Sequence, residues 1–365
     1  MRLGFAVKVL GGGGLPSHDT RRWQSDPHLR VSIGYLDAIF DYLGDAGIDM
    51  YRMTASLAPY ATHPNLPQFR GQIEHCAEEL EGLGRRAREQ GLRLSTHPGQ
   101  YVVLNSEDER IRDLAVAELE LQAELFDAMD LGPEAVVVLH VGGAAGGLQA
   151  GMDRFVAGFE RVSERARSRL VIENDDRTYG LGHVHELHER TGVRVVWDIL
   201  HHHCNDPDGV PDREALERAL ATWPDGVRPK IHYSSPKTAT EEREKRVGRR
   251  IERTLALPQL RAHADLIDPI GFEHFLRETA AGLDSDVLLE AKAKDLALLR
   301  LREQLAARGI DLGAVAQSSR SYLGGRRRRR GARTARVRAP LSEPCLVSEQ
   351  TDGGAKGGVR AAGPW

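Results

Sequence analysis

Short apolar runs of strand-like composition recur along the chain and alternate with segments of helical periodicity. The strand-like runs cover residues 2–7, 48–54, 92–96, 135–141, 169–173, 193–199, 228–233 and 286–291. Several are apolar at nearly every position, as expected of parallel strands buried on both faces. Between them, apolar residues recur at intervals of three and four, as in 31–43, 107–129 and 293–308. This alternation predicts an α/β fold, a single (β/α)8 TIM barrel over residues 1–312.

Two segments depart from this alternation. The link 234–285 is long and contains the charged stretch TATEEREKRVGRRIERT. Because a structureless loop of that length is uncommon in a compact domain, we expect helical insertions there. Residues 313–365 are rich in Arg, Gly, Ser and Ala and poor in large apolar residues. We therefore expect a disordered basic tail, whose run Arg326–Arg330 either adds non-specific phosphate affinity or is simply solvated.

The net charge of −3 is unevenly distributed along the chain. Residues 314–365 contain ten Arg and one Lys against two Glu and one Asp, a net +8, so the remaining 313 residues carry −11. An acidic body is not typical of a general nucleic-acid binder. Bound divalent metals would offset part of this charge, and any phosphate-binding surface would have to be local.

Composition also excludes several classes of protein. No apolar run reaches the ~18 residues needed to span a membrane, and the first residues do not resemble a signal peptide. The cysteines Cys76, Cys204 and Cys345 are too scattered for a disulfide framework. The loop Gly11–Gly14 lacks the motif of a nucleotide-binding loop, so no nucleotide cofactor is predicted. We expect a monomer in a reducing cytoplasm.

Side chains that can bind a metal stand at the carboxyl ends of successive predicted strands. In chain order they are His97, His140, Glu173, Asp198, His201, Lys230, His232 and Glu290. One such residue is usually an ordinary buried polar group, but their recurrence in successive βα units indicates one site at the top of the barrel. Imidazoles mixed with carboxylates suit Mn, Zn or Fe. Two or three ions ~3.5–4 Å apart can activate water and stabilise both oxygens of a phosphodiester displacement.

Other polar residues near the predicted top face have two interpretations each. Arg52 either pairs with buried carboxylates or contacts a phosphate, and His63 is a lesser functional candidate. Gln100 and Tyr101, at the tip of a loop, could wedge between bases, with ordinary loop packing as the alternative. His202 and His203 are assigned to packing or solvent. Structural roles are expected for His18, His28, His75, His183, His185, His188 and His274.

Taken together, these motifs resemble the UV damage endonuclease family of xylose-isomerase-like barrels, whose site is similar to that of endonuclease IV. The segments that carry the resemblance are RLGFAVKVLG, YRMTASLAPYATHP, LSTHPGQYVVLNS, LHVGG, IENDDRTYG, VVWDILHHHCN, PKIHYSSP, RAHADLIDP and LLEAKAKDLAL. They run in order over residues 1–312 and include none of the tail. The resemblance implies an enzyme that nicks DNA 5′ to a UV photoproduct with a cluster of divalent ions, typically Mn2+ rather than Zn2+ or Mg2+.

The resemblance also implies roles for individual residues. One ion would be held by His97, His140 and Glu173, a second by Glu173, Asp198, His232 and Glu290, and a third by His201 and His263, with Asp265 as a weaker candidate. Glu173 and Lys230 would be catalytic, and Lys230 matches the lysine that is carbamylated in the family. Gln100 and Tyr101 match the pair that probes the lesion. Some relatives have Tyr and Asn where this chain has Phe5, Lys8 and Val9; Phe5 can stack on a lesion but cannot donate a hydrogen bond.

The predicted function is therefore a UV damage repair endonuclease that acts on damaged double-stranded DNA through metal-activated water. A manganese-dependent sugar isomerase or epimerase on the same barrel is the alternative. The pair Gln100–Tyr101 and the number of histidines favour the nuclease. A metal-binding module without catalysis is disfavoured by the complete set of ligands.

Overall fold

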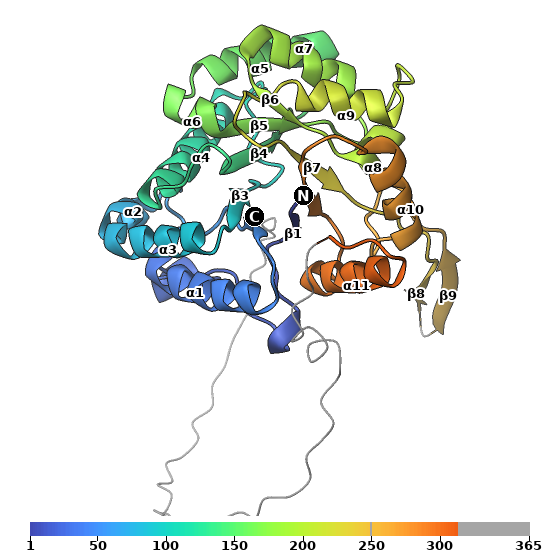
Figure 1. Cartoon of the computed structure of the whole chain (residues 1–365). Helices are drawn as coiled ribbons and strands as arrows, with labels where there is room; N and C mark the ends of the chain where they lie inside the picture. The colour runs from blue at the N-terminus through green and yellow to red at the C-terminus, as the bar shows by residue number, and fades with distance from the viewer. Residues whose placement is uncertain (249, 313–365) are drawn as a thin grey trace, which may run out of the picture. The chain divides into compact units, whose positions relative to one another are not determined.

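Eight parallel strands form a barrel enclosed by helices in the computed structural model, which describes residues 1–248 and 250–312 (Figure 1). The strands are β1 Leu3–Ala6, β2 Met50–Met53, β3 Arg93–Thr96, β4 Val136–His140, β5 Leu170–Glu173, β6 Arg194–Val196, β7 Lys230–Tyr233 and β10 Asp286–Leu289. Their order in the sheet is β6-β5-β4-β3-β2-β1-β10-β7. The ring closes between β6 and β7, where the His232 backbone N–H donates to the Trp197 carbonyl at 2.9 Å. The predicted barrel is thus confirmed.

Helices surround the strands and cover their outer faces (Figure 1). They are α1 Leu29–Asp45, α2 Gln72–His75, α3 Ala77–Glu89, α4 Glu109–Ala128, α5 Leu148–Glu160, α6 Glu164–Arg169, α7 Leu181–Thr191, α8 Ile199–Cys204, α9 Asp212–Leu220, α10 Pro269–His274 and α11 Lys294–Ala307. The three helical segments predicted from periodicity correspond to α1, α4 and α11. Gly309 follows α11 with a φ of 79°, a left-handed conformation that glycine adopts without strain. The core lies between the strands and this layer of helices.

The predicted strand at 193–199 ends early, at Val196. The Asp198 side chain accepts a hydrogen bond from the His201 backbone N–H at 2.8 Å and so caps the start of α8. The chain therefore turns helical just after Asp198, which allows Asp198 and His201, three residues apart, to share a face. This turn brings two candidate ligands to the end of one strand.

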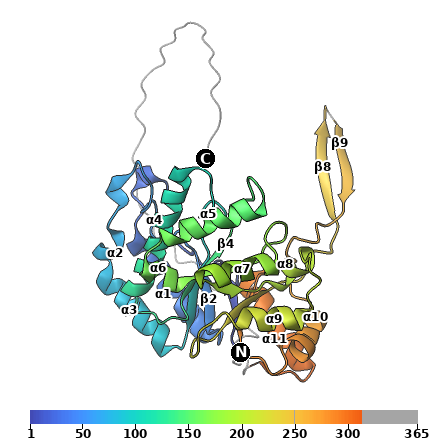
Figure 2. The ribbon, with the colours of Figure 1, turned by 90° about the horizontal axis from the view of Figure 1, so that it is seen from above.

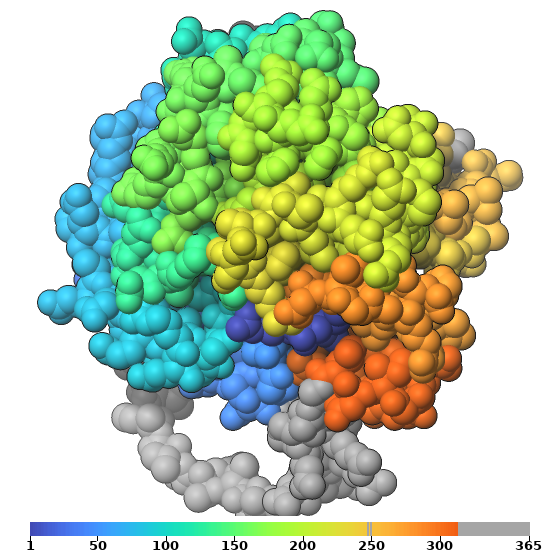
Figure 3. Space-filling model, turned by 45° about the horizontal axis from the view of Figure 1, so that its top comes forward, coloured from blue at the N-terminus to red at the C-terminus, as the bar shows by residue number. Residues whose placement is uncertain are grey.

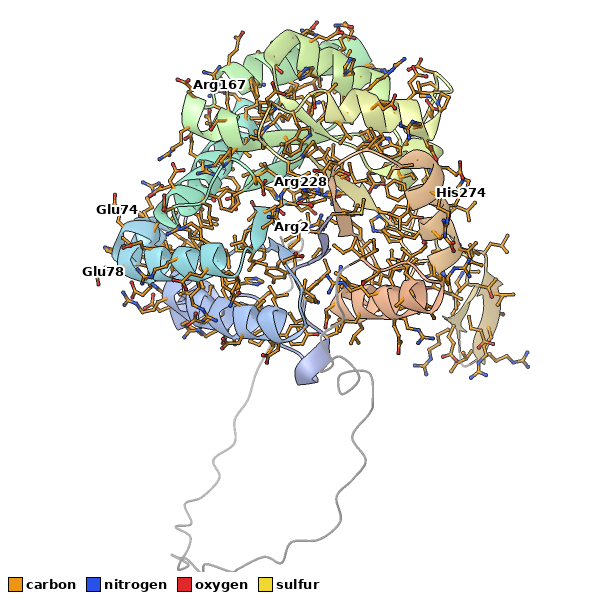
Figure 4. All side chains as sticks on the ribbon, in the orientation of Figure 1. Arg2, Glu74, Glu78, Arg167, Arg228 and His274 are labelled. Carbon is orange, nitrogen blue, oxygen red and sulfur yellow. The ribbon has the colours of Figure 1, made fainter. Side chains whose placement is uncertain are left out.

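The amino-terminal end of the barrel is closed by a network of charges around Asp286. This fully buried carboxylate forms ion pairs with Arg2 at 3.1 Å, Arg93 at 2.9 Å and Arg228 at 2.9 Å. Figure 4 shows Arg2 and Arg228 beside the strands in the middle of the barrel, whereas His274 lies on the outer helix α10. Burial raises the pKa of Asp286, but Arg2 and Arg93 outweigh this effect and lower it. The network leaves the opposite end of the barrel for the candidate site.

The long link after β7 differs in part from the prediction. Residues of the charged stretch form an antiparallel hairpin, with β8 Glu241–Val247 and β9 Arg250–Ala256, instead of a helix. Gly248, at a φ of 64°, lies in the turn and allows the backbone to reverse. The expectation of helix is wrong for this stretch and right further on, where α10 continues into a π-helical turn, Phe275–Thr279.

Three other predictions concern membrane-spanning segments, the cysteines and the C-terminal tail. Within residues 1–248 and 250–312, no helix has both the length and the apolar character required to cross a bilayer. Cys76 and Cys204 are free thiols in this part of the chain. The predicted tail 313–365, with Cys345 and the run Arg326–Arg330, lies outside the described residues.

Candidate metal centre and neighbouring loop

Glu173, the last residue of β5, lies at the centre of a cluster of histidines. Its carboxylate oxygens lie 3.0 Å from His232 Nδ1, 3.1 Å from His97 Nε2, 3.3 Å from His201 Nδ1 and 3.8 Å from His140 Nε2. Only 1% of the Glu173 surface is exposed. Because the strands are parallel, their carboxyl ends meet at one end of the barrel and deliver these side chains to one point.

Two groups of possible ligands share Glu173. The first consists of His97, His140 and Glu173, and the second of Glu173, Asp198, His232 and Glu290; within each group the ligand atoms lie within 4.8 Å of one another. These are the groupings that the resemblance implied for two ions. The first group comes from the neighbouring strands β3, β4 and β5, whereas the second joins the ends of β5 and β6 to those of β7 and β10, which meet only where the barrel closes.

The two predicted ligands of the third ion border this cluster. The His201 and His263 rings lie 6.0 Å apart between centroids, and His263 Nδ1 is 3.6 Å from Glu290 Oε2. Asp265, the weaker candidate, is exposed and belongs to neither group among the described residues. Its backbone carbonyl accepts the Ala293 N–H at 2.9 Å.

Several buried polar atoms in the cluster have no hydrogen-bond partner in the described part of the chain. They are His140 Nδ1, Asp198 Oδ2 and His232 Nε2. An unpaired buried polar atom is costly unless a ligand satisfies it. Among the three clustered carboxylates, only Glu290 pairs with an arginine, Arg52. Surplus negative charge and free imidazole nitrogens fit divalent cations of the Mn, Zn or Fe type.

The electrostatics of the cluster depend on burial and on close charges. Burial lowers the pKa of His201, but Asp198 and Glu173 more than reverse this effect and raise the pKa to about 11. Burial raises the pKa of Asp198 to about 7 and lowers that of His232 to about 4. Imidazole binds a metal only in its neutral form, so a cation near His201 would take the place of its proton.

Lys230 is buried within the barrel below the cluster. Its Nζ donates a hydrogen bond to Ser95 Oγ at 2.9 Å, and the residue has no exposed surface. Burial lowers the pKa of Lys230 well below its usual range, and the charges of Arg52 and Arg93 lower it further. A neutral lysine amine is nucleophilic, which carbamylation requires.

Sequence reasoning missed two residues that position the site. Asn174 is fully buried; its side chain accepts the Asp198 N–H at 2.9 Å and donates to the Asp198 carbonyl at 3.0 Å. Its own carbonyl lies 3.0 Å from His201 Nδ1. The other residue is Ser95, the partner of Lys230. The sequence did offer a signal for each: Asn174 is a polar residue directly after the ligand Glu173, and Ser95 is a polar residue inside the strand β3.

Gln100 and Tyr101 lie on an exposed loop beside the cluster. Tyr101 is 82% exposed, which leaves its ring free to stack on another molecule. A hollow of about 310 Å³ is lined by Gln100, His140 and His201, among others. The loop tip and two candidate ligands thus line one continuous space.

Phe5 does not fit the predicted contact with a lesion. It has 0% exposed surface and packs against Tyr51, with ring centroids 5.3 Å apart. A side chain enclosed in this way has no face for a base to stack on, so this prediction is wrong for the structure described. Tyr51 does not replace it, because its hydroxyl donates to the Val7 carbonyl and is itself buried.

The remaining polar candidates have ordinary structural contacts. Arg52 pairs with Glu290, as the first of its two interpretations predicted. His63 is exposed, and its Nδ1 accepts the Asn65 N–H at 3.2 Å. His202 Nε2 lies 2.8 Å from the Val210 carbonyl, and His203 Nε2 lies 2.8 Å from Asp212. His63, His202 and His203 belong to no candidate metal group within the described residues.

The fold and the site define a (β/α)8 barrel with a candidate multi-metal centre at the carboxyl ends of its strands. The chain belongs to the UV-endonuclease UvdE family, whose model matches residues 32–317. It is 32% identical over 277 residues to the UV DNA damage endonuclease of Bacillus velezensis, covering 74% of this chain and 79% of that protein. The enzyme of the same name from Bacillus pumilus is 33% identical over 265 residues, with 71% and 76% covered. The crystal structure of SacUVDE superposes with a TM-score of 0.71 at 27% identity, covering 85% of this chain and 99% of the other.

Proposed function

We propose that this protein is a DNA repair endonuclease that nicks damaged double-stranded DNA 5′ to UV photoproducts. The observation that carries the proposal is the cluster of imidazoles and carboxylates around Glu173, which opens into the same hollow as Gln100. The names of the relatives support a nuclease over a sugar isomerase or epimerase.

The residues of the cluster would hold two or three ions. Five of the eight proposed ligands are imidazoles, which disfavours Mg2+, and we favour Mn2+ over Zn2+ because of the resemblance to UV damage endonucleases. His97, His140 and Glu173 would hold one ion, and Glu173, Asp198, His232 and Glu290 a second. His201 and His263 would complete a third site. When bound, such ions supply an activated water and stabilise the charge on phosphodiester oxygens.

The chain itself would orient the reactants around this centre. Arg52 holds Glu290 in place, and Asn174 holds Asp198 through two hydrogen bonds. Gln100 and Tyr101 would read the distortion of a lesion, since a weakly paired nucleotide costs less to displace from the stack. Lys230, whose pKa is lowered by burial, would be the site of carbamylation.

The remaining parts of the proposal concern the organisation of the protein. Residues 1–312 would be the catalytic domain, and residues 313–365 a basic tail that adds non-specific affinity for DNA. We expect a monomer, and the free thiols Cys76 and Cys204 support a reducing compartment such as the cytoplasm.

A nicking assay on supercoiled plasmid tests the function. UV-irradiated plasmid should be nicked in the presence of Mn2+, whereas unirradiated plasmid should stay supercoiled. EDTA should stop the reaction, and Mn2+ added in excess of EDTA should restore it. Equal nicking of both plasmids would contradict lesion specificity, and nicking that survives EDTA would contradict the metal mechanism.

A further inference from the structure

The hairpin β8–β9 projects from the barrel as a separate ribbon (Figure 2). In this view it points away from the chain's N-terminus, on the side to which the carboxyl end of β7 leads. In the space-filling view it also stands out from the edge of the body (Figure 3). Its position places it beside the candidate site, and no role in the proposed function accounts for it.

The base of the hairpin is joined to the metal centre through short backbone contacts. Pro236 pairs with His263, and Ala264 N–H donates to the Ser235 carbonyl at 2.9 Å. On the hairpin side, the Lys237 N–H donates to the Ala262 carbonyl at 2.7 Å. One of the two segments that lead into the ribbon therefore contains the candidate ligand His263, so the base of the ribbon lies next to the metal centre.

The ribbon carries unpaired positive charge, most of it in the half near the turn. Four exposed cations form no ion pair with any described residue: Arg243, nearer the base, and Lys245, Arg246 and Arg250, nearer the turn. In sequence, residues 245–250 contain four basic residues and no acid, although residues 1–313 together carry a net −11. A local cluster of cations on an acidic body marks a surface for an anionic partner.

The arrangement of these cations fits a nucleic-acid groove. Lys245 lies opposite Glu252 on one face of the ribbon, whereas Arg246 lies opposite Ile251 on the other. Each face of the ribbon therefore presents a cation. A ribbon in a groove of DNA lies between two phosphate backbones, so cations on both faces can each reach one of them. The major groove of DNA admits a two-stranded ribbon, and seven residues per strand span about 24 Å.

We propose that this hairpin is an arm that contacts the backbone phosphates of the DNA duplex flanking the lesion. The inference rests on the proposed function, because it takes damaged duplex DNA as the substrate. It adds a phosphate-binding element outside the metal centre and outside the loop of Gln100 and Tyr101. The arm increases affinity for the duplex and does not select the lesion, because phosphates are the same at every base pair.

Binding measurements across a salt series test the arm in the full-length chain. The test variant combines Lys245→Gln, Arg246→Gln and Arg250→Gln, all at exposed positions, and circular dichroism checks its fold. For a long damaged duplex, the slope of log affinity against log salt should become shallower by about 2 to 3, because each phosphate contact contributes about 0.9. On a duplex trimmed to the immediate surroundings of the lesion, the variant should match the wild type.

The matched control combines Glu242→Gln and Glu252→Gln, which remove two unpaired acids from the same ribbon. It should bind the long duplex at least as tightly as the wild type. An unchanged salt slope in the test variant would overturn the proposal that the hairpin binds phosphates. The hairpin would then be better explained as a surface for a protein partner, because Ile251 and Leu255 are 62% and 66% exposed. Failure of the wild type to nick irradiated plasmid would instead contradict the proposed function, so the two failures are distinguishable.

Discussion

The Oε1 atom of Glu173 lies 3.0 Å from Nδ1 of His232, and both side chains are buried. The two residues come from β5 and β7, which are not neighbours in the sheet, so their contact forms only across the inside of the barrel. The pKa of Glu173 is lowered because the nearby His232 and His140 outweigh the effect of burial, which raises it. The carboxylate therefore stays ionised where both candidate metal groups meet.

Replacing this shared ligand should disable both groups together. Glu173→Gln keeps the size of the side chain but removes its charge, so metal affinity should fall by more than the ~10–100-fold typical of changes to outer-shell partners. Nicking of irradiated plasmid should fall to background. Metal content per protein and nicking rate are the measurements. Glu118→Gln, a half-buried acid outside both metal groups, serves as the control, and near-normal nicking by the Glu173 variant would refute the assignment.

The exposed loop should govern recognition more than chemistry. The double variant Gln100→Ala, Tyr101→Ala should lose about 1–3 kcal/mol of affinity for a damaged duplex, the range measured when a stacking aromatic is removed. Binding to an undamaged duplex should change little, because the metal ligands and charged surfaces are intact. The measurement is the affinity of the variant and of the wild type for damaged and undamaged duplexes at one salt concentration. A variant that keeps the wild-type preference for damage would exclude this loop as the lesion probe.

A buried carboxylate far from the centre should make stability depend on pH. Asp19 accepts hydrogen bonds from the Arg21 side chain and from the His28 backbone N–H, which lower its pKa to about 2. Because the folded pKa is lower than the unfolded one, the stabilisation is present above ~pH 4 and is lost as the pH falls towards 2.

Asp19→Asn should therefore lower the free energy of unfolding at pH 7 by on the order of 1–2 kcal/mol, allowing for the partial exposure of Arg21. The difference from the wild type should shrink as the pH falls from ~4 to ~2. Urea unfolding at several pH values measures it, with the exposed Asp26→Asn as the control. A difference that does not depend on pH would show that Asp19 acts through packing and not through its charge.

Truncation after Leu312 should preserve metal binding and site-specific incision, because all the proposed ligands precede residue 300. The net +8 of residues 314–365 should instead contribute to general DNA affinity. Its removal should flatten the salt dependence of binding while lesion preference is kept. Comparing full-length and truncated protein over a salt series is the test. Unfolding of the truncated protein, or loss of incision at low salt with metal present, would show that the tail is part of the enzyme.

Local pattern was sufficient to predict the barrel and most of the candidate ligands. Runs buried on both faces indicate parallel strands, and parallel strands bring their carboxyl ends together, so His97, His140, Glu173 and His232 could be placed at one site. These predictions succeeded because each depends on strand direction and on residues adjacent in sequence.

Other features were decided by contacts that the hydrophobic pattern does not indicate. The charged stretch became a hairpin because Gly248 allows a reversal and the two strands pair, which a count of charges does not indicate. Phe5 is enclosed in the structure. The sequence did not indicate this, because an apolar residue on a strand can face either the barrel interior or the exposed rim. The pairing of Arg52 with Glu290 depends on segments brought together by folding. The lowered pKa of Lys230, which donates to Ser95, depends on its burial and on the nearby charges of Arg52 and Arg93. Sequence therefore determined which chemical groups stand at the strand ends, whereas tertiary structure determined their partners and protonation, because both depend on distance and solvent exclusion.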